Sequence, residues 1–175
     1  GTTSGMNRIA RIFSHLQPKK DVVLVSIMEH HSNDLPHRKH GGHVIHIPVD
    51  THESKMGCVD MDLLEHYLSE YEGRVNYVSI TGISNVTGII NPINEVAKLA
   101  HHYGAYIVVD AAQMAAHVPI HISGHSDPEM DVEKVCILLA EYADCLSLAA
   151  TVPEDIDTLP PAVFCAVITF SNVQP

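Results

Sequence analysis

Four short, continuous apolar runs alternate along the chain with stretches whose apolar residues recur at helical spacing. Runs that are apolar at nearly every position are typical of strands buried on both faces, as in parallel sheets. The alternation therefore predicts βαβ units and a mostly parallel sheet in an α/β fold. The predicted strands are residues 22–27, 44–49, 75–80 and 105–109.

Apolar residues at helical spacing predict the elements between these strands. A first stripe over residues 6–16 is ended by Pro18, Asp60 is placed to cap a second over residues 63–71, and a third ends near Gly104. The polar residues 29–42 are rich in turn formers and receive no helix or strand. Farther on, residues 132–148 predict a helix, residues 152–161 a loop or linker, and residues 162–170 a strand.

Length and charge narrow the functional class. The 175 residues suit one domain, and 21 acidic against 10 basic residues give a formal charge of −11. This balance argues against binding to nucleic acid or to an anionic membrane surface. The four cysteines form no C-x-x-C pair, which favours a reducing compartment, the cytoplasm or an organelle. Because residues 1–7 already resemble the entrance to a helix, we expect the chain to begin inside a larger domain.

Two groups of polar residues in the first part of the chain are suited to ligand chemistry. The sequence G-T-T-S-G opens a predicted helix, where free N–H groups, the helix dipole and the hydroxyls of Thr2 and Thr3 favour a phosphate. An ordinary N-cap without a ligand is the alternative. His30, in E-H-H-S-N after a predicted strand, can stack on a flat ring or transfer a proton. A solvated loop histidine is its alternative.

Two further groups follow the later strands, at the edge of a parallel sheet where ligands bind. Asn85, in S-N-V-T-G, can donate to a phenolic oxygen, or it can bond its own backbone in a turn. Asp110 ends a buried strand in V-D-A-A-Q, which also contains Gln113. A buried carboxylate requires a partner. A protonated pyridine nitrogen is one such partner, and a metal ion or a purely structural role are the alternatives.

The order and spacing of these groups carry a family resemblance. The motifs G-T-T-x-x-x-N, M-E-H-H-S-N, S-N-V-T-G-x-x-N-P and V-D-A-A-Q-x-x-x-H-x-P together resemble the class V aminotransferase family, most closely its cysteine desulfurase branch. The similarity spans residues 1–122. It implies a fold type I enzyme dependent on pyridoxal 5'-phosphate (PLP), with a three-layer α/β/α large domain around a mainly parallel seven-stranded sheet, usually in a homodimer.

The resemblance also implies a set of cofactor contacts. Thr2 and Thr3 would hold the phosphate at the start of the first helix, and His30 would stack on the pyridine ring and be a candidate for proton transfer. Asn85 and Gln113 would contact the phenolic oxygen, and Asp110 would pair with the pyridine nitrogen. His117 matches a family position of less clear role.

One element of the family pattern is not found. Family members carry a Schiff-base lysine in an S-x-H-K motif on the strand after the one that ends in Asp. Here residues 132–139 read V-E-K-V-C-I-L-L. Residues 123–126, S-G-H-S, imitate the motif, but Ser126 replaces the lysine and the segment lies too early. Lys134 fits no motif. We therefore expect PLP chemistry to be impaired in this chain.

The resemblance divides the chain into an incomplete PLP-binding core, residues 1–131, and a divergent tail, residues 132–175. A truncated copy, a gene-model error or a splice variant would each explain the tail. The parent activity implied is sulfur removal from cysteine, or amino-group chemistry on a cysteine-like substrate. A noncatalytic PLP-fold remnant or interaction protein is the alternative. The 14 histidines suggest a metal protein only weakly, and we predict no metal ligands.

Overall fold

The computed structural model describes residues 2–40, 42–53, 55–115, 117–118, 136–140 and 168–169. Four helices and six strands are assigned within this part of the chain. The helices are α1 (Thr2–Leu16), α2 (His31–His40), α3 (Met61–Glu70) and α4 (Ile93–His102). The strands are β1 (Val22–Ser26), β2 (His43–Ile47), β3 (Val75–Thr81), β4 (Tyr106–Asp110), β5 (Cys136–Ala140) and β6 (Ile168–Thr169).

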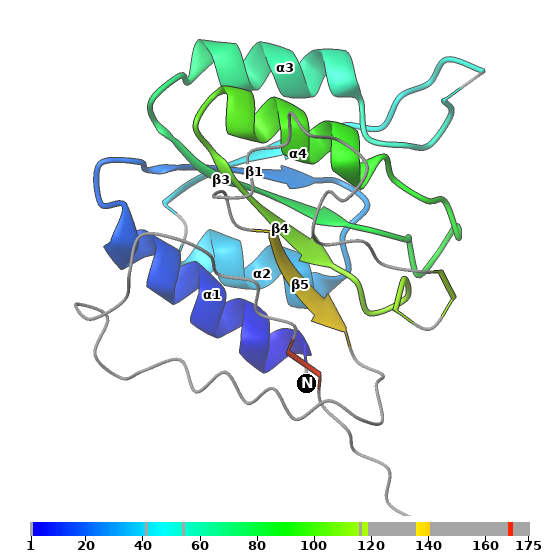
Figure 1. Cartoon of the computed structure of the whole chain (residues 1–175), viewed down its shortest axis with the longest axis horizontal. Helices are drawn as coiled ribbons and strands as arrows, with labels where there is room; N and C mark the ends of the chain where they lie inside the picture. The colour runs from blue at the N-terminus through cyan, green and yellow to red at the C-terminus, as the bar shows by residue number, and fades with distance from the viewer. Residues whose placement is uncertain are drawn as a thin grey trace, which may run out of the picture.

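The strands form one sheet in the order β2-β1-β3-β4-β5-β6, and every pairing in it is parallel. Helices α3 and α4 cover one face of the sheet, and α1 and α2 cover the other (Figure 1). Every residue of β1 and β3 is buried, as expected for central strands of a covered parallel sheet. The predicted three-layer α/β/α fold with a mainly parallel sheet is therefore confirmed.

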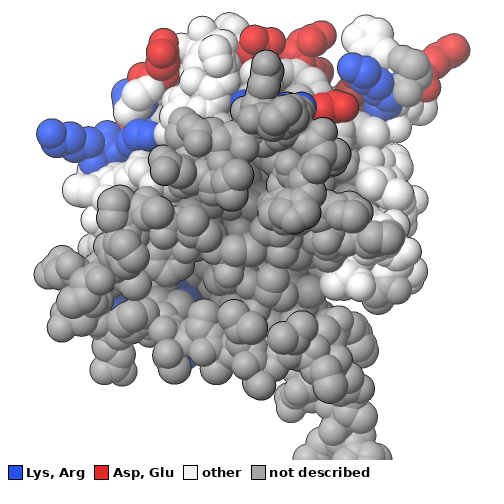
Figure 2. Space-filling model, viewed as in Figure 1, with Lys and Arg blue, Asp and Glu red and all other residues white. Residues whose placement is uncertain are grey.

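Apolar packing holds α3 and α4 against the sheet. Leu64 and Leu68 of α3 and Val96 of α4 are fully buried in one cluster with side chains of β1, β3 and β4. Asp60 begins α3 as predicted, because its side chain accepts a hydrogen bond from the Leu63 N–H at 2.9 Å. The outer face of α3 is exposed and acidic, and Figure 2 shows acidic side chains along the edge where this helix lies.

The opposite face of the sheet is packed differently. Met6, Ile9 and Phe13 of α1 lie in a smaller apolar cluster, in which the ring of Phe13 is 4.8 Å from that of Tyr77. Beside it, α2 buries polar residues: Ser32, Asn33, Asp34 and His37. Residues 29–42, to which the sequence assigned no element because they are polar and rich in turn formers, contain α2 over His31–His40. A helix held by buried polar side chains lacks the apolar stripe that identifies helices from sequence.

The predicted helix over residues 132–148 is also wrong where the structure describes it. Residues Cys136–Ala140 form strand β5, which pairs in parallel with β4 from Ile107 to Asp110. A short apolar run does not distinguish a strand from a buried helix by periodicity. Pairing with the second edge of β4 decides between them, because that edge otherwise carries unpaired N–H and C=O groups. The predicted strand over residues 162–170 contains β6, and residues 152–161 lie outside the described part.

No helix among the described residues is long and apolar enough to cross a membrane.

Candidate cofactor site

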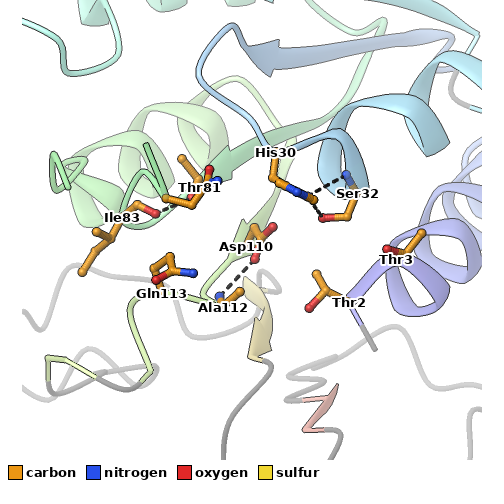
Figure 3. Close-up of a pocket in the computed structure, with 10 residues that line it drawn as sticks. Thr2, Thr3, His30, Ser32, Thr81, Ile83, Asp110, Ala112 and Gln113 are labelled. Carbon is orange, nitrogen blue, oxygen red and sulfur yellow. Dashed lines mark hydrogen bonds between the residues drawn. The ribbon is translucent and has the colours of Figure 1, made fainter. Parts of the chain in front are cut away.

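A pocket opens at the carboxyl ends of β3 and β4, next to the start of α1. Its cavity measures about 160 Å³. In Figure 3, Thr2 and Thr3 lie on one side, Thr81, Ile83 and Gln113 lie on the other, and Asp110 lies between them. All the site residues predicted from the sequence line this one pocket: Thr2, Thr3, His30, Asn85, Asp110 and Gln113. Four lining residues were not predicted: Ser32, Thr81, Ile83 and Ala112.

The start of α1 provides donors for an anion. Thr2 is 5% exposed, and its Oγ1 has no hydrogen-bond partner among the described residues. A buried hydroxyl without a partner costs free energy. A ligand atom that forms a hydrogen bond with the Thr2 hydroxyl would remove this cost. The first turn of α1 contains no acidic residue, and the helix dipole places partial positive charge there. These features suit a phosphate group.

His30 lies at the rim, between the end of β1 and the start of α2. Its Nδ1 accepts a hydrogen bond from the Ser32 backbone N–H at 3.2 Å and lies 2.9 Å from the Ser32 Oγ. Because a backbone N–H can only donate, Nδ1 is the unprotonated nitrogen and a neutral ring carries its proton on Nε2. Ser32 thus fixes both the orientation and the tautomer of the imidazole beside the pocket (Figure 3).

Asp110 is the last residue of β4 and is 4% exposed. Its Oδ1 accepts a hydrogen bond from the Ala112 N–H at 3.0 Å, and it pairs in register with Thr81 at the end of β3. Strand pairing therefore holds the carboxylate at the floor of the pocket. A cationic ring nitrogen brought to this position would gain a charge-assisted hydrogen bond.

The two predicted amide residues come from loops. Asn85 is exposed in the turn after β3, where the Ser84 Oγ accepts from the N–H groups of Val86 and Thr87, both at 3.3 Å. Gly88, with φ +72°, closes this turn in a conformation that favours glycine. The turn is therefore held by Ser84, which leaves the Asn85 amide available at the pocket. Gln113 is exposed in the turn that follows β4.

Sequence reasoning missed four lining residues and one neighbour. Ser32 and Ala112 lie inside the motifs that carried the prediction, and Thr81 directly follows a predicted strand. The neighbour is Glu29, whose carboxylate accepts hydrogen bonds from the Ser26 hydroxyl, from the Asn33 Nδ2 at 2.6 Å and from the Thr81 N–H at 2.7 Å. Its position directly before His30 was the available signal.

The environment of Glu29 changes its acidity. Burial raises the pKa of the Glu29 carboxyl to about 7, and the negative charge of Asp110 adds to this rise. The hydrogen bonds from Ser26, Asn33 and Thr81 act in the opposite direction, because they stabilise the carboxylate. Both protonation states of Glu29 are therefore populated near neutral pH.

Lys134, the lysine weighed for the Schiff-base role, and residues 123–126, which imitate the motif, lie outside the described residues. Within the described part, no group of three or more His, Cys, Asp and Glu side chains is arranged to hold a metal ion. The magnesium alternative for Asp110 therefore gains no ligand set from these residues.

The fold and the pocket together define an α/β protein with a candidate ligand site at the carboxyl edge of its parallel sheet. A parallel α/β sheet presents a helix start suited to a phosphate and a strand-end carboxylate suited to a cation, both lining one cavity. Residues 1–126 match the family model of aminotransferase class-V, and the chain belongs to this family. The family resemblance inferred from the motifs is confirmed.

Known relatives place the chain near cysteine desulfurases. A cysteine desulfurase of Synechococcus elongatus is 32% identical over 127 residues, which cover 70% of this chain and 19% of the relative. The solved cysteine desulfurase CsdA of Escherichia coli aligns with a TM-score of 0.56 and 29% identity, over 68% of this chain and 29% of that one. The apo cysteine desulfurase of Thermococcus onnurineus NA1 aligns with a TM-score of 0.56 and 30% identity, over 67% and 28%.

The chain spans less than a third of the length of the curated relatives it matches, from 18% to 30%. Its fold is that of the large domain of fold type I PLP-dependent enzymes, which these solved structures share. The activity, substrate and partners of the whole protein are therefore matters for proposal.

Proposed function

We propose that this chain binds PLP in the pocket at the carboxyl ends of β3 and β4. The observation that carries the proposal is the presence of two complementary features in one cavity. The Thr2 hydroxyl at the helix start lacks a hydrogen-bond partner among the described residues, and the Asp110 carboxylate is buried at a strand end. A phosphorylated, cationic ring matches both features at once.

Each predicted site residue has a role in this proposal. Thr2, Thr3 and the N–H groups at the start of α1 bind the phosphate, and Asp110 pairs with the pyridine nitrogen and keeps it protonated. His30 stacks on the ring and is a candidate for proton transfer from its Nε2. Asn85 and Gln113 donate to the phenolic oxygen. When bound, PLP supplies an electron sink for chemistry at the α-carbon of an amino acid.

We propose a cysteine desulfurase-type parent activity, which removes sulfur from cysteine or performs amino-group chemistry. Its support is the family membership and the names of the relatives. In this chain the activity is impaired, because no S-x-H-K motif follows Asp110 to supply the lysine that PLP enzymes of this family use. A homodimer, as in full-length relatives, stays a prediction for this protein. So does a cytoplasmic or organellar location.

A second candidate is a noncatalytic PLP-fold remnant that binds the cofactor reversibly, or a partner protein. The missing lysine motif favours it. The two candidates differ in one observable. Borohydride treatment would label a lysine that is covalently joined to PLP, whereas reversible binding would leave no labelled lysine.

Titration of PLP into the full chain, followed by its absorbance, tests the proposal. A phosphorylated pyridine analogue without the aldehyde serves as the second probe, because it cannot react with surface lysines. Asp110→Asn is expected to weaken the binding of both probes at least about tenfold, through loss of a charge-assisted bond. Asp21→Asn is the matched control, since exposed Asp21 pairs with Arg74 at the opposite end of β1.

Equal affinity of the unsubstituted and Asp110→Asn chains for the aldehyde-free analogue would remove the proposed site. Borohydride treatment followed by peptide mapping then separates the candidates. A single labelled lysine supports the desulfurase-type enzyme, and reversible binding without a label supports the remnant.

A further inference from the structure

A chain of buried hydrogen bonds leads from the core of the protein to the pocket. The Tyr77 hydroxyl lies 2.8 Å from the Nδ1 of His37, and the Nε2 of His37 lies 3.0 Å from the Oδ1 of Asn33. Asn33 Nδ2 donates to Glu29 at 2.6 Å. The Ser79 hydroxyl joins the chain by donating to the Asn33 Oδ1 at 2.8 Å. Tyr77, His37, Asn33 and Ser79 are all buried.

The hydrogen bonds of this buried chain all run in one direction, from donor to acceptor toward Glu29. Because Asn33 Oδ1 is an acceptor, as its bond from Ser79 shows, the His37 Nε2 that faces the same oxygen must donate to it. Burial lowers the pKa of His37 to about 4, so its ring is neutral at pH 7 and its Nδ1 accepts from Tyr77. Burial also raises the pKa of Tyr77, which keeps its hydroxyl protonated. Every donor therefore points toward Glu29, which ends the chain as an acceptor.

Glu29 joins three elements at the pocket. It accepts from Ser26 at the end of β1, from Asn33 in the first turn of α2, and from the N–H of Thr81, which pairs in register with Asp110. The negative charge that acts on Glu29 from another strand is that of Asp110 on β4. β1 presents Ser26, β3 presents a backbone N–H, and α2 presents Asn33 with neutral His37 behind it.

We propose that Glu29 is a positioning residue of the cofactor site: it ties β1 and β3 to α2, and its ionised carboxylate adds a second negative charge beside Asp110 that strengthens the binding of a cationic ring. This inference rests on the proposed function. The directed chain stabilises the carboxylate form of Glu29, since all its donors point to it, and Asp110 opposes that form until a cation arrives. Ring binding and ionisation of Glu29 therefore favour each other.

Glu29→Gln tests this coupling, because it removes the charge at nearly constant shape. PLP affinity is measured at about pH 8 and about pH 5.5, on either side of the Glu29 transition, for the substituted and the unsubstituted chain. The ratio of the two affinities cancels the titration of PLP itself. At the higher pH we expect Glu29→Gln to bind PLP roughly five to ten times more weakly, and at the lower pH to differ by less than about twofold.

Three controls accompany the variant. Glu65→Gln makes the same chemical change on the exposed face of α3 and should leave both affinities unchanged. Glu29→Asp keeps the charge and should keep the pH dependence, even if shorter reach weakens binding. Inorganic phosphate, which lacks a ring cation, should bind Glu29→Gln no more weakly than the unsubstituted chain.

A second measurement needs no substitution, so a poorly folded variant leaves the inference testable. Carbon-13 NMR of the Glu29 carboxyl in the full chain reports its titration with and without PLP, and the midpoint should fall when PLP is bound. An unmoved midpoint, or equal affinity ratios at both pH values, overturns the role of Glu29 while PLP binding stands. No PLP binding to the unsubstituted chain overturns the proposed function, and this inference with it.

Discussion

The two faces of the sheet are covered by helices that are held in different ways. Toward α3 and α4, strand β3 presents Val78 and Ile80 to a continuous apolar cluster. Toward α1 and α2, the same strand presents Tyr77 and Ser79, which enter the buried hydrogen-bond chain. Alternation along one strand thus separates a face stabilised by apolar burial from a face stabilised partly by directed bonds.

The two kinds of packing contribute differently to the pocket. Apolar burial has no direction, and it tolerates exchange among side chains of similar volume. Hydrogen bonds fix particular atoms, and the bonds of Glu29 tie the end of β3 to the start of α2 beside the cavity. We infer that the α3 and α4 face mainly supplies stability, whereas the α1 and α2 face supplies the geometry of the site.

Truncating a side chain in the apolar cluster under α3 and α4 should cause the largest loss of stability. Leu64 is fully buried between α3 and the sheet, and Leu64→Ala leaves a cavity there. We expect a loss of about 2 to 5 kcal/mol in the free energy of unfolding, measured by urea denaturation. Val86→Ala is the control, because Val86 is 82% exposed and its loss should be within about 0.5 kcal/mol. A Leu64→Ala loss no larger than that of the control would contradict the assignment of stability to this face.

The buried polar groups on the α1 and α2 face should make the stability of the protein depend on pH. The pKa of His37 is lowered to about 4 in the fold, so the stability it contributes is present above pH 6.5 and is lost as pH falls toward 4. The pKa of Glu29 is raised to about 7, so its contribution is present below pH 4.5 and is lost as pH rises through 7. Between these limits the two effects oppose each other in the unsubstituted chain.

Single substitutions should separate the two effects. Relative to the unsubstituted chain, His37→Gln should lose stability increasingly as pH rises from about 4 to 6.5, and Glu29→Gln should gain stability as pH rises from about 4.5 to 7. Each difference should change by at most about 1.4 kcal/mol per pH unit. Urea unfolding across this range measures both. Differences that stay flat with pH for both variants would show that neither group titrates as its burial requires.

How much of this could be predicted from the sequence also differs between the faces. Strands β1 to β4 and the helices α3 and α4 follow from apolar runs and stripes, and the Asp60 cap was predicted at the residue where it occurs. Helix α2 was missed, because its buried residues, such as Asn33 and His37, are polar types that normally indicate a loop. Their burial is made favourable partly by partners distant in sequence, Tyr77 and Ser79.

The candidate site was predictable for a related reason. Residues at strand ends and at a helix start are brought together by the parallel topology, so the motifs around Thr3, His30, Asn85 and Asp110 pointed to one pocket. Glu29 was not recognised although it directly precedes His30, since its proposed role depends on a bond from Thr81 and on the charge of Asp110, both far along the chain. Strand β5 was missed because its apolar run acquires its structure from pairing with β4.

The smallest expected effect tests whether the apolar face also depends on directed bonds. Asp60 satisfies the Leu63 N–H at the start of α3, and Asp60→Ala removes that bond without opening a cavity. We expect a loss of about 1 kcal/mol in the free energy of unfolding. Asp62→Ala, in the first turn of α3, removes an exposed carboxylate that favours the helix dipole and should cost less, about 0.3 to 1 kcal/mol.

Neither Asp60 nor Asp62 lines the pocket, so PLP affinity should stay unchanged in both variants. Titration of PLP into each folded variant measures this. A loss of affinity in Asp60→Ala comparable to that of Glu29→Gln would show that the two faces are coupled, and that the division of labour between them is wrong.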